Sequence, residues 1–208
     1  MLTLLWWAAN IATPALFAYR NLRCGRRAMA CQDYLRAERY LDRAACHPAV
    51  RQTALCLLAQ AALQCQQPQK ALIALDRLFD EPPSRKDRQP LFLRALACLA
   101  LREGHAALAI LAHFADRPDA SIEERLAMVH ACILVEDFDA ACVFLSMIPA
   151  HQIAGPLRAR LQLCHAAIHF HRQRWPQSLH ALPSVQDCSA DDGIIVEQLQ
   201  LQLADKAE

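Results

Sequence analysis

Four residues in the C-terminal third of the chain have types and a spacing that could bind a metal ion: Cys164, His165, His169 and His171. His165 and His169 are four positions apart, so on a helix both imidazoles lie on one face and form half of a zinc site. A catalytic zinc needs a third ligand, and the acidic neighbour of an HExxH helix is missing here. The alternative is that they are core or groove histidines, whose ordinary pKa near ~6.5 would make binding sensitive to pH. We prefer this second interpretation and expect no metal and no cofactor.

Cysteine is the second reactive residue type, with ten copies and no CxxC pair. The thiols occur singly in segments rich in Ala and Leu, where a thiol behaves as a small hydrophobic group. Disulfide frameworks belong to small secreted domains that lack a core, whereas this chain has 208 residues of which 55% are hydrophobic. We therefore expect free core thiols, which favours the reducing cytoplasm. The ten positions are Cys24, Cys31, Cys46, Cys56, Cys65, Cys98, Cys132, Cys142, Cys164 and Cys188.

Catalytic motifs are missing from the sequence. It contains no GxGxxG, GxxxxGK[ST] or GxSxG, and four glycines are too few for a loop that binds phosphate. No pattern singles out an activated thiol among the cysteines and histidines. The net charge of +1 gives no indication of nucleic-acid binding. The sequence therefore predicts no catalytic residue and no nucleic-acid partner.

The composition favours an all-α fold. Aromatic residues make up only 6% of the chain, and the hydrophobic content comes mainly from Ala and Leu, which are good helix formers. The 11 prolines fall mostly between apolar blocks, where they start or stop helices. No sustained run of alternating β-branched residues predicts a strand.

One segment, 52–85, contains an apolar helix, a short break with Gln and Pro, a second apolar helix and then Pro82-Pro83. It resembles the tetratricopeptide repeat, in which small residues at positions 8 and 20 let two helices cross closely and larger residues fill the space between hairpins. Counted from Gln52, the matching residues are Leu55, Leu58, Ala59, Ala62, Ala71, Leu75, Leu78 and Pro83.

The same pattern recurs, with drift, over residues 18–185. Gly25 and Ala97 take the close-contact position in the first and third units. The fifth unit matches poorly, because His165 and His169 replace apolar residues. The position-20 residues are assigned to Ala37, Ala71, Ala109, Ala141 and Ser178, which are 32 to 38 residues apart.

The resemblance implies a right-handed α-solenoid of about five degenerate helical hairpins, and a generic helical bundle is the alternative. Residues 186–208 are expected to form a capping helix, with Ile194, Ile195, Leu199 and Leu203 on its apolar face.

The N-terminal segment 1–17 is apolar, and no charged residue occurs before Arg20, Arg23, Arg26 and Arg27. A stretch of this kind, residues 1–19, could cross a bilayer with the arginines on the cytoplasmic side. Asn10, Thr13 and Pro14 interrupt it, so we prefer a helix that caps the apolar end of the array. Docking onto a partner is the third alternative.

A concave surface lined by the first helix of each hairpin is where such solenoids bind their partners. The residues that the resemblance places there are Leu22, Arg26, Met29, Cys56, Gln60, Leu63, Leu91, Arg94, Cys98, Leu101, Arg102, Leu126, His130 and Ile133. The Lys and Asn residues that clamp an acidic peptide in one branch of the family are missing. An apolar groove edged by Arg26, Arg94 and Arg102 suits an amphipathic helix with acidic flanks.

A weaker resemblance covers about the first 120 residues. The stretches 24–35 and 96–104 are similar to small tetratricopeptide chaperones of bacterial type III secretion systems, which hold the needle subunit in the cytoplasm. The expected function is a cytoplasmic chaperone or adaptor that binds an amphipathic helix of another protein. The alternative is a scaffold or assembly factor anchored at the inner membrane by residues 1–19.

Overall fold

The computed structural model describes residues 2–78, 88–113, 117, 119–149, 153–184, 196–197, 199–200 and 202–204, with the side chains of residues 2–13, 156, 175, 176 and 179 excepted. Every element within these ranges is a helix and no strand occurs in them, as the composition predicts. The chain forms two compact units, Met1–Arg102 and Glu103–Glu208.

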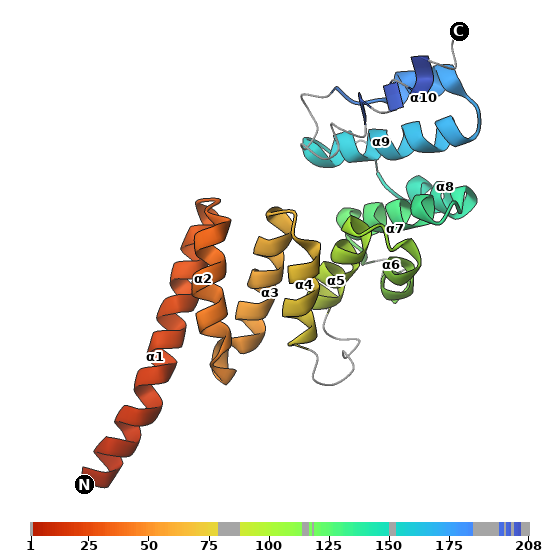
Figure 1. The fold of residues 1–208 in the computed structure, drawn as a ribbon. Coiled ribbons are helices and arrows are strands. Elements are labelled where there is room, and N and C mark those ends of the chain that lie inside the picture. The colour runs from red at the N-terminus through yellow and green to blue at the C-terminus, as the bar shows by residue number, and fades with distance from the viewer. Residues whose placement is uncertain are drawn as a thin grey trace. The chain divides into compact units, whose positions relative to one another are not determined.

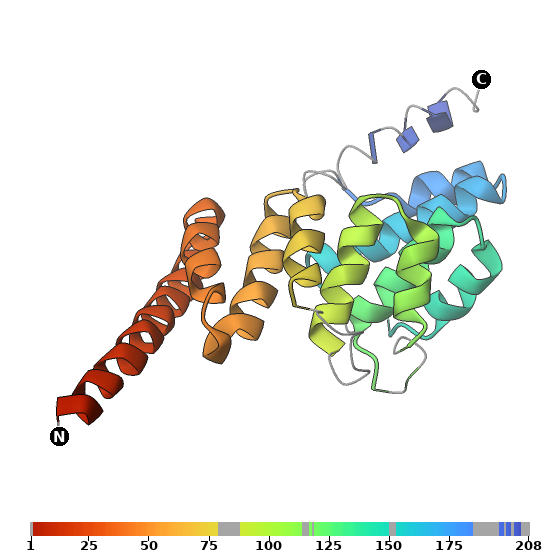
Figure 2. The same cartoon turned by 60° about the horizontal axis from the view of Figure 1, so that its bottom comes forward.

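The first unit contains five helices in chain order (Figures 1 and 2). They are α1 (Leu2–Ala30), α2 (Tyr34–Ala45), α3 (Pro48–Gln64), α4 (Pro68–Asp76) and α5 (Arg88–Ala100). Each helix packs against the next, and α3 also contacts both α1 and α5. Leu41, Leu55 and Leu75 are fully buried in the core of this unit. The first helices of successive hairpins therefore lie next to each other.

The second unit contains α6 (Gly104–Leu111), α7 (Ile122–Leu134), α8 (Phe138–Ser146), α9 (Pro156–His171) and α10 (Trp175–Ala181). α7 packs against α6, α8 and α9, and α9 packs against α10. Leu111, Leu126 and Val129 are its largest fully buried side chains in these helices.

The predicted capping segment, 186–208, is described at 196–197, 199–200 and 202–204. These residues are helical, and Val196 and Leu203 are buried. Ile194 and Ile195 lie outside the described residues.

Local sequence signals set the helix ends. Proline occupies the first turn of α3, α4 and α9, where its missing N–H costs nothing. The Asp33 side chain accepts from the Arg36 N–H at 3.2 Å at the start of α2. α7 begins with a capping box, in which Ser121 and Glu124 each accept from the other's backbone N–H. Pro14 is an exception, because it lies inside α1.

One backbone turn recurs along the chain. Among the described residues, five other than glycine have positive φ, and each lies two positions after the end of α1, α3, α5, α7 or α9: Gln32 (59°), Gln66 (57°), Arg102 (61°), Glu136 (62°) and Gln173 (56°). After Gln32, Gln66, Glu136 and Gln173 the next residue donates its N–H to a carbonyl five positions earlier, as Asp33 does to Ala28 at 2.9 Å and Asp137 to Cys132 at 2.9 Å. This is the Schellman arrangement, which satisfies the last carbonyls of a helix.

Burial follows the recurring turn at a constant spacing. The residue five positions after each turn residue is fully buried, and these residues are Ala37, Ala71, Ala107, Ala141 and Ser178. The sequence-based assignment of Ala109 in the third unit is therefore wrong, since Ala109 is exposed and Ala107 takes its place. The segment 104–109 holds three alanines, so composition alone does not distinguish between them.

The close-contact positions behave as predicted. A Cβ added to Gly25 would lie 2.6 Å from Cδ2 of Leu41, which is fully buried. Only glycine allows α1 and α2 to approach this closely with Leu41 in place. In the second hairpin Ala59 and Ala71 are both completely buried.

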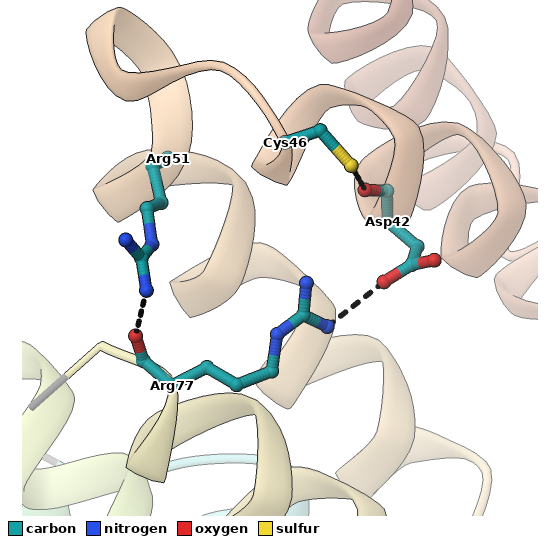
Figure 3. A network of polar contacts seen from close by, with 4 residues as sticks. All are labelled: Asp42, Cys46, Arg51 and Arg77. Atoms are coloured by element: carbon teal, nitrogen blue, oxygen red, sulfur yellow. Dashed lines mark hydrogen bonds and ion pairs between the residues drawn. The ribbon is translucent and has the colours of Figure 1, made fainter.

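A polar network joins the first two hairpins on the surface (Figure 3). Arg77, at the C-terminal end of α4, donates from Nη1 to Oδ1 of Asp42 on α2 at 2.9 Å. Its carbonyl oxygen accepts from Nη2 of Arg51 on α3 at 2.7 Å. Arg125 of α7 makes the same kind of bond in the second unit, to the Met147 carbonyl at the end of α8, at 2.8 Å. In each of these two hairpins, an arginine in the first turn of the first helix thus hydrogen-bonds to a carbonyl at the end of the second helix.

α1 runs through the domain boundary that the sequence predicts between residues 17 and 18 without interruption. It has 29 residues and α2 has 12, so within the first unit the N-terminal half of α1 extends beyond the end of α2 (Figures 1 and 2). Leu16, Phe17 and Tyr19 are exposed on it. Within the described residues, no helix has the length and the apolar character needed to cross a membrane.

Candidate functional site

A surface hollow of about 380 Å³ lies between α1 and α3 in the first unit. Its lining combines a cation, two amides, a phenol and aliphatic groups, supplied by Arg26, Met29, Ala30, Tyr34, Leu57, Gln60 and Gln64. Three of these residues, Arg26, Met29 and Gln60, are among those that the sequence places on the groove. The structure therefore brings part of the predicted surface together at one place.

The packing of the first two hairpins positions this lining. Gly25 lets α1 approach α2, and the tight turn at Gln32 brings Tyr34 back beside the end of α1. Met29 and Leu57 are half-buried and pack against the core cluster, so each presents only part of its side chain. We call these two half-buried apolar side chains, Met29 and Leu57, the apolar floor of the hollow.

The rim of the hollow is polar. Arg26, Gln60 and Gln64 are exposed. No ion pair engages Arg26 within the part of the chain that the structure describes. An apolar floor with a cationic and amide rim can bind the apolar stripe of an amphipathic helix whose flanks are acidic.

The other predicted groove residues divide by burial. Leu22, Cys56, Leu91, Cys98 and Leu126 are buried, so we leave them out of the proposed site. The groove residues that keep exposed surface outside the hollow are Leu63, Arg94, Leu101, Arg102, His130 and Ile133. Arg94 is paired with Asp76 at 3.0 Å, and Arg102 is a turn residue. The five buried groove residues are covered because neighbouring alanine-rich helices pack closely on the face that they share.

Sequence reasoning missed four residues of the hollow: Ala30, Tyr34, Leu57 and Gln64. In the family pattern Ala30 and Gln64 both fall at position 13, one of the positions that face the groove, so the signal was present. Tyr34 begins the second helix of its hairpin, and Leu57 is outside that pattern. Only the packing of α1 on α3 reveals these two.

The histidines of the second unit form a different site. The rings of His165 and His169 have centroids 6.5 Å apart and planes 22° apart, so they stack instead of converging on one point. They line a hollow of about 400 Å³ with Gln162, Gln177, His180 and Ala181. Within the described residues, no three His, Cys, Asp or Glu side chains form a group that could hold a metal ion.

The three histidines differ in their surroundings. The pKa of His165 is lowered, mainly because the ring is partly desolvated and to a smaller extent because His169 lies nearby. Nδ1 of His169 is buried with no hydrogen-bond partner in the described part of the chain. His171 instead stacks on Phe138, with ring centroids 3.6 Å apart. His165 is exposed, although its place in the repeat predicts packing between helices.

The nine cysteines that the structure describes are all free thiols. Burial, and to a smaller extent Asp137, raise the pKa of Cys132 to about 11, and burial followed by Glu38 raises the pKa of Cys65. A raised pKa lowers the fraction of reactive thiolate. Cys31 and Cys46 are exposed, which corrects the expectation that the thiols belong to the core. Cys188 lies outside the described residues.

No protein-family model matches this chain, and neither the curated proteins nor the solved structures contain a match.

Proposed function

We propose that this chain is a right-handed tetratricopeptide-like solenoid that acts by binding, without catalysis, and holds an amphipathic helix of another protein as a chaperone or adaptor. The hollow between α1 and α3 carries the proposal, because it joins an apolar floor to a polar rim. The turn that recurs at five positions supports the repeat, since a constant turn produces hairpins of constant geometry.

Charge and burial indicate what the hollow binds. Met29 and Leu57 offer partly exposed apolar surface, which stabilises a complex when it is removed from water. Arg26 offers an exposed guanidinium beside them, which favours a carboxylate on the ligand. An amphipathic helix with leucine or isoleucine on one face and glutamate at its edge supplies both groups.

The resemblance to type III secretion chaperones points to the same ligand class. The segment 24–35, which carries that resemblance, supplies Arg26, Met29, Ala30 and Tyr34 to the hollow. Chaperones of that kind bind an apolar helix of the needle subunit. We therefore propose that the partner is a helix-forming, self-assembling secretion subunit.

The test is the affinity of the full chain for a synthetic amphipathic peptide with Leu and Ile on one helical face and Glu at the flanks, measured by fluorescence anisotropy. We expect Leu57→Asp to weaken binding about tenfold or more. The peptide would cover the new carboxylate, and its desolvation should cost ~1.4 kcal/mol or more of binding free energy.

The matched control is Ile73→Asp, since Ile73 is a branched aliphatic residue of the same unit that is 61% exposed on α4 and does not line the hollow. It should leave the affinity unchanged, and circular dichroism should show that both variants are folded. Equal affinities for the two folded variants would contradict the proposal.

A further inference from the structure

The outer face of α1 carries an uncommon combination of exposed side chains. Leu16, Arg20, Arg23 and Arg27 follow each other at spacings of four, three and four residues, which places them on one face of the helix. Leu16 is 68% exposed and the three arginines are exposed as well.

The opposite face of the same helix is buried. Ala18, Leu22, Gly25 and Ala28 follow at spacings of four, three and three residues, and all are buried. Arg26 belongs to neither row, because it lines the hollow between α1 and α3. The outer face is therefore a surface distinct from the proposed helix-binding site.

The positive charge of this face is uncompensated. α1 contains no Asp or Glu, and no ion pair or hydrogen bond engages the side chains of Arg20, Arg23 or Arg27 within the described residues. The two carboxylates of the adjacent α2 are occupied elsewhere, since Glu38 lies 3.9 Å from Lys70 and Asp42 pairs with Arg77.

Large exposed apolar side chains lie beside this charge. Phe17 is 57% and Tyr19 is 52% exposed, so with Leu16 three such residues occur within four positions. The sequence before them contains no charged residue back to Met1 and includes Trp6 and Trp7. Aromatic residues next to arginines are typical of segments that lie at the boundary between lipid headgroups and acyl chains.

We propose that the outer face of α1 binds the surface of a bilayer that contains anionic lipids. Arg20, Arg23 and Arg27 contact the headgroup phosphates, and Leu16, Phe17 and Tyr19 enter the boundary with the acyl chains. This is peripheral binding, and it leaves the hollow edged by Arg26 open to a protein partner. The chain would then present its bound helix next to a membrane.

Flotation of the full chain with phosphatidylcholine vesicles, prepared with and without phosphatidylglycerol, tests the proposal. Binding is expected only to the anionic vesicles, and it should weaken as salt is raised. The double variant Arg20→Gln/Arg23→Gln should bind roughly 20- to 30-fold more weakly, because each basic residue near an anionic surface contributes about fivefold. Leu16→Gln should weaken binding too.

Matched controls separate this face from a general effect of charge or polarity. Arg39→Gln/Arg43→Gln removes the same charge from exposed positions of α2, and Ile73→Gln makes the same kind of polar change on α4. Both controls should bind like the original chain. Circular dichroism first shows that each variant is folded, so this result is read independently of the hollow and of whether it binds a peptide.

Two outcomes would overturn the proposal. One is equal binding to vesicles with and without phosphatidylglycerol, or binding that the Arg20→Gln/Arg23→Gln variant retains. The other is no vesicle binding together with a concentration-dependent dimer that Leu16→Gln abolishes, which would assign the face to a second copy of the chain.

Discussion

At the residue scale, the turn that joins the two helices of each hairpin stores a small conformational cost. Gln32, Gln66, Arg102, Glu136 and Gln173 all adopt positive φ, where a side chain other than glycine is disfavoured. The left-handed conformation costs about 1–2 kcal/mol for such residues. The chain has only four glycines, and none of them is used at these turns.

Replacing Gln32 by glycine should therefore stabilise the protein. The expected gain is about 0.5–1 kcal/mol, because removing the Cβ relieves the left-handed strain but adds freedom to the unfolded chain. Thermal unfolding followed by circular dichroism measures it. The control Gln52→Gly, at an exposed position inside α3, should lose about 1 kcal/mol. A loss of stability in both variants would contradict the strain argument.

At the scale of the elements, two kinds of contact join the first hairpin to the second. The buried seam is an apolar cluster with residues from both hairpins, and it includes the fully buried Leu41 and Leu75. The polar network on the surface joins Asp42 to Arg77, whose side chains are 61% and 43% exposed. Exposed ion pairs contribute about 0.2–1 kcal/mol, whereas a buried leucine contributes several times more. The apolar seam is therefore the main source of cohesion.

Two substitutions on neighbouring residues of α4 and its cap measure this difference. Leu75→Ala should lower the free energy of unfolding by about 2–5 kcal/mol, because it removes buried methyl groups and leaves a cavity. Arg77→Gln should cost no more than about 1 kcal/mol, since the Arg77 carbonyl still accepts from Arg51. Urea denaturation gives both values. A larger loss for Arg77→Gln than for Leu75→Ala would show that the polar network dominates.

At the scale of the whole molecule, each of the two compact units is held together mainly by contacts between neighbouring helices. Where helices contact mainly their neighbours, a defect weakens its own surroundings first. The fully buried Leu55 of α3 belongs to the first unit, and the nearly fully buried Leu126 of α7 belongs to the second.

Hydrogen exchange followed by mass spectrometry tests this locality. Leu55→Ala should speed exchange most in α2, α3 and α4, whereas Leu126→Ala should do so most in α6, α7, α8 and α9. The two variants serve as each other's control, because both remove a buried leucine side chain. A uniform increase over all helices in either variant would instead indicate one cooperative fold.

The sequence by itself determined the helical class and several of the small residues that are buried between helices. These follow from local rules: alanine and leucine favour helices, proline and capping residues mark helix starts, and small residues recur where helices cross. Gly25 and Ala71 illustrate the last rule, because one lies against Leu41 and the other is fully buried.

Only the tertiary structure decided which alanine of the segment 104–109 is buried and which residues line the candidate site. Helix periodicity states which residues share a face, but burial depends on how closely the next helix approaches. Leu126 is therefore buried in the core, although the sequence pattern predicts that it faces the groove. Leu57 lines the hollow, although nothing in the sequence pattern predicts it there. Ala107 is buried and Ala109 is not for a related reason. The residue five positions after the backbone turn at Arg102 is the buried one, and the alanine-rich sequence does not distinguish between these alanines.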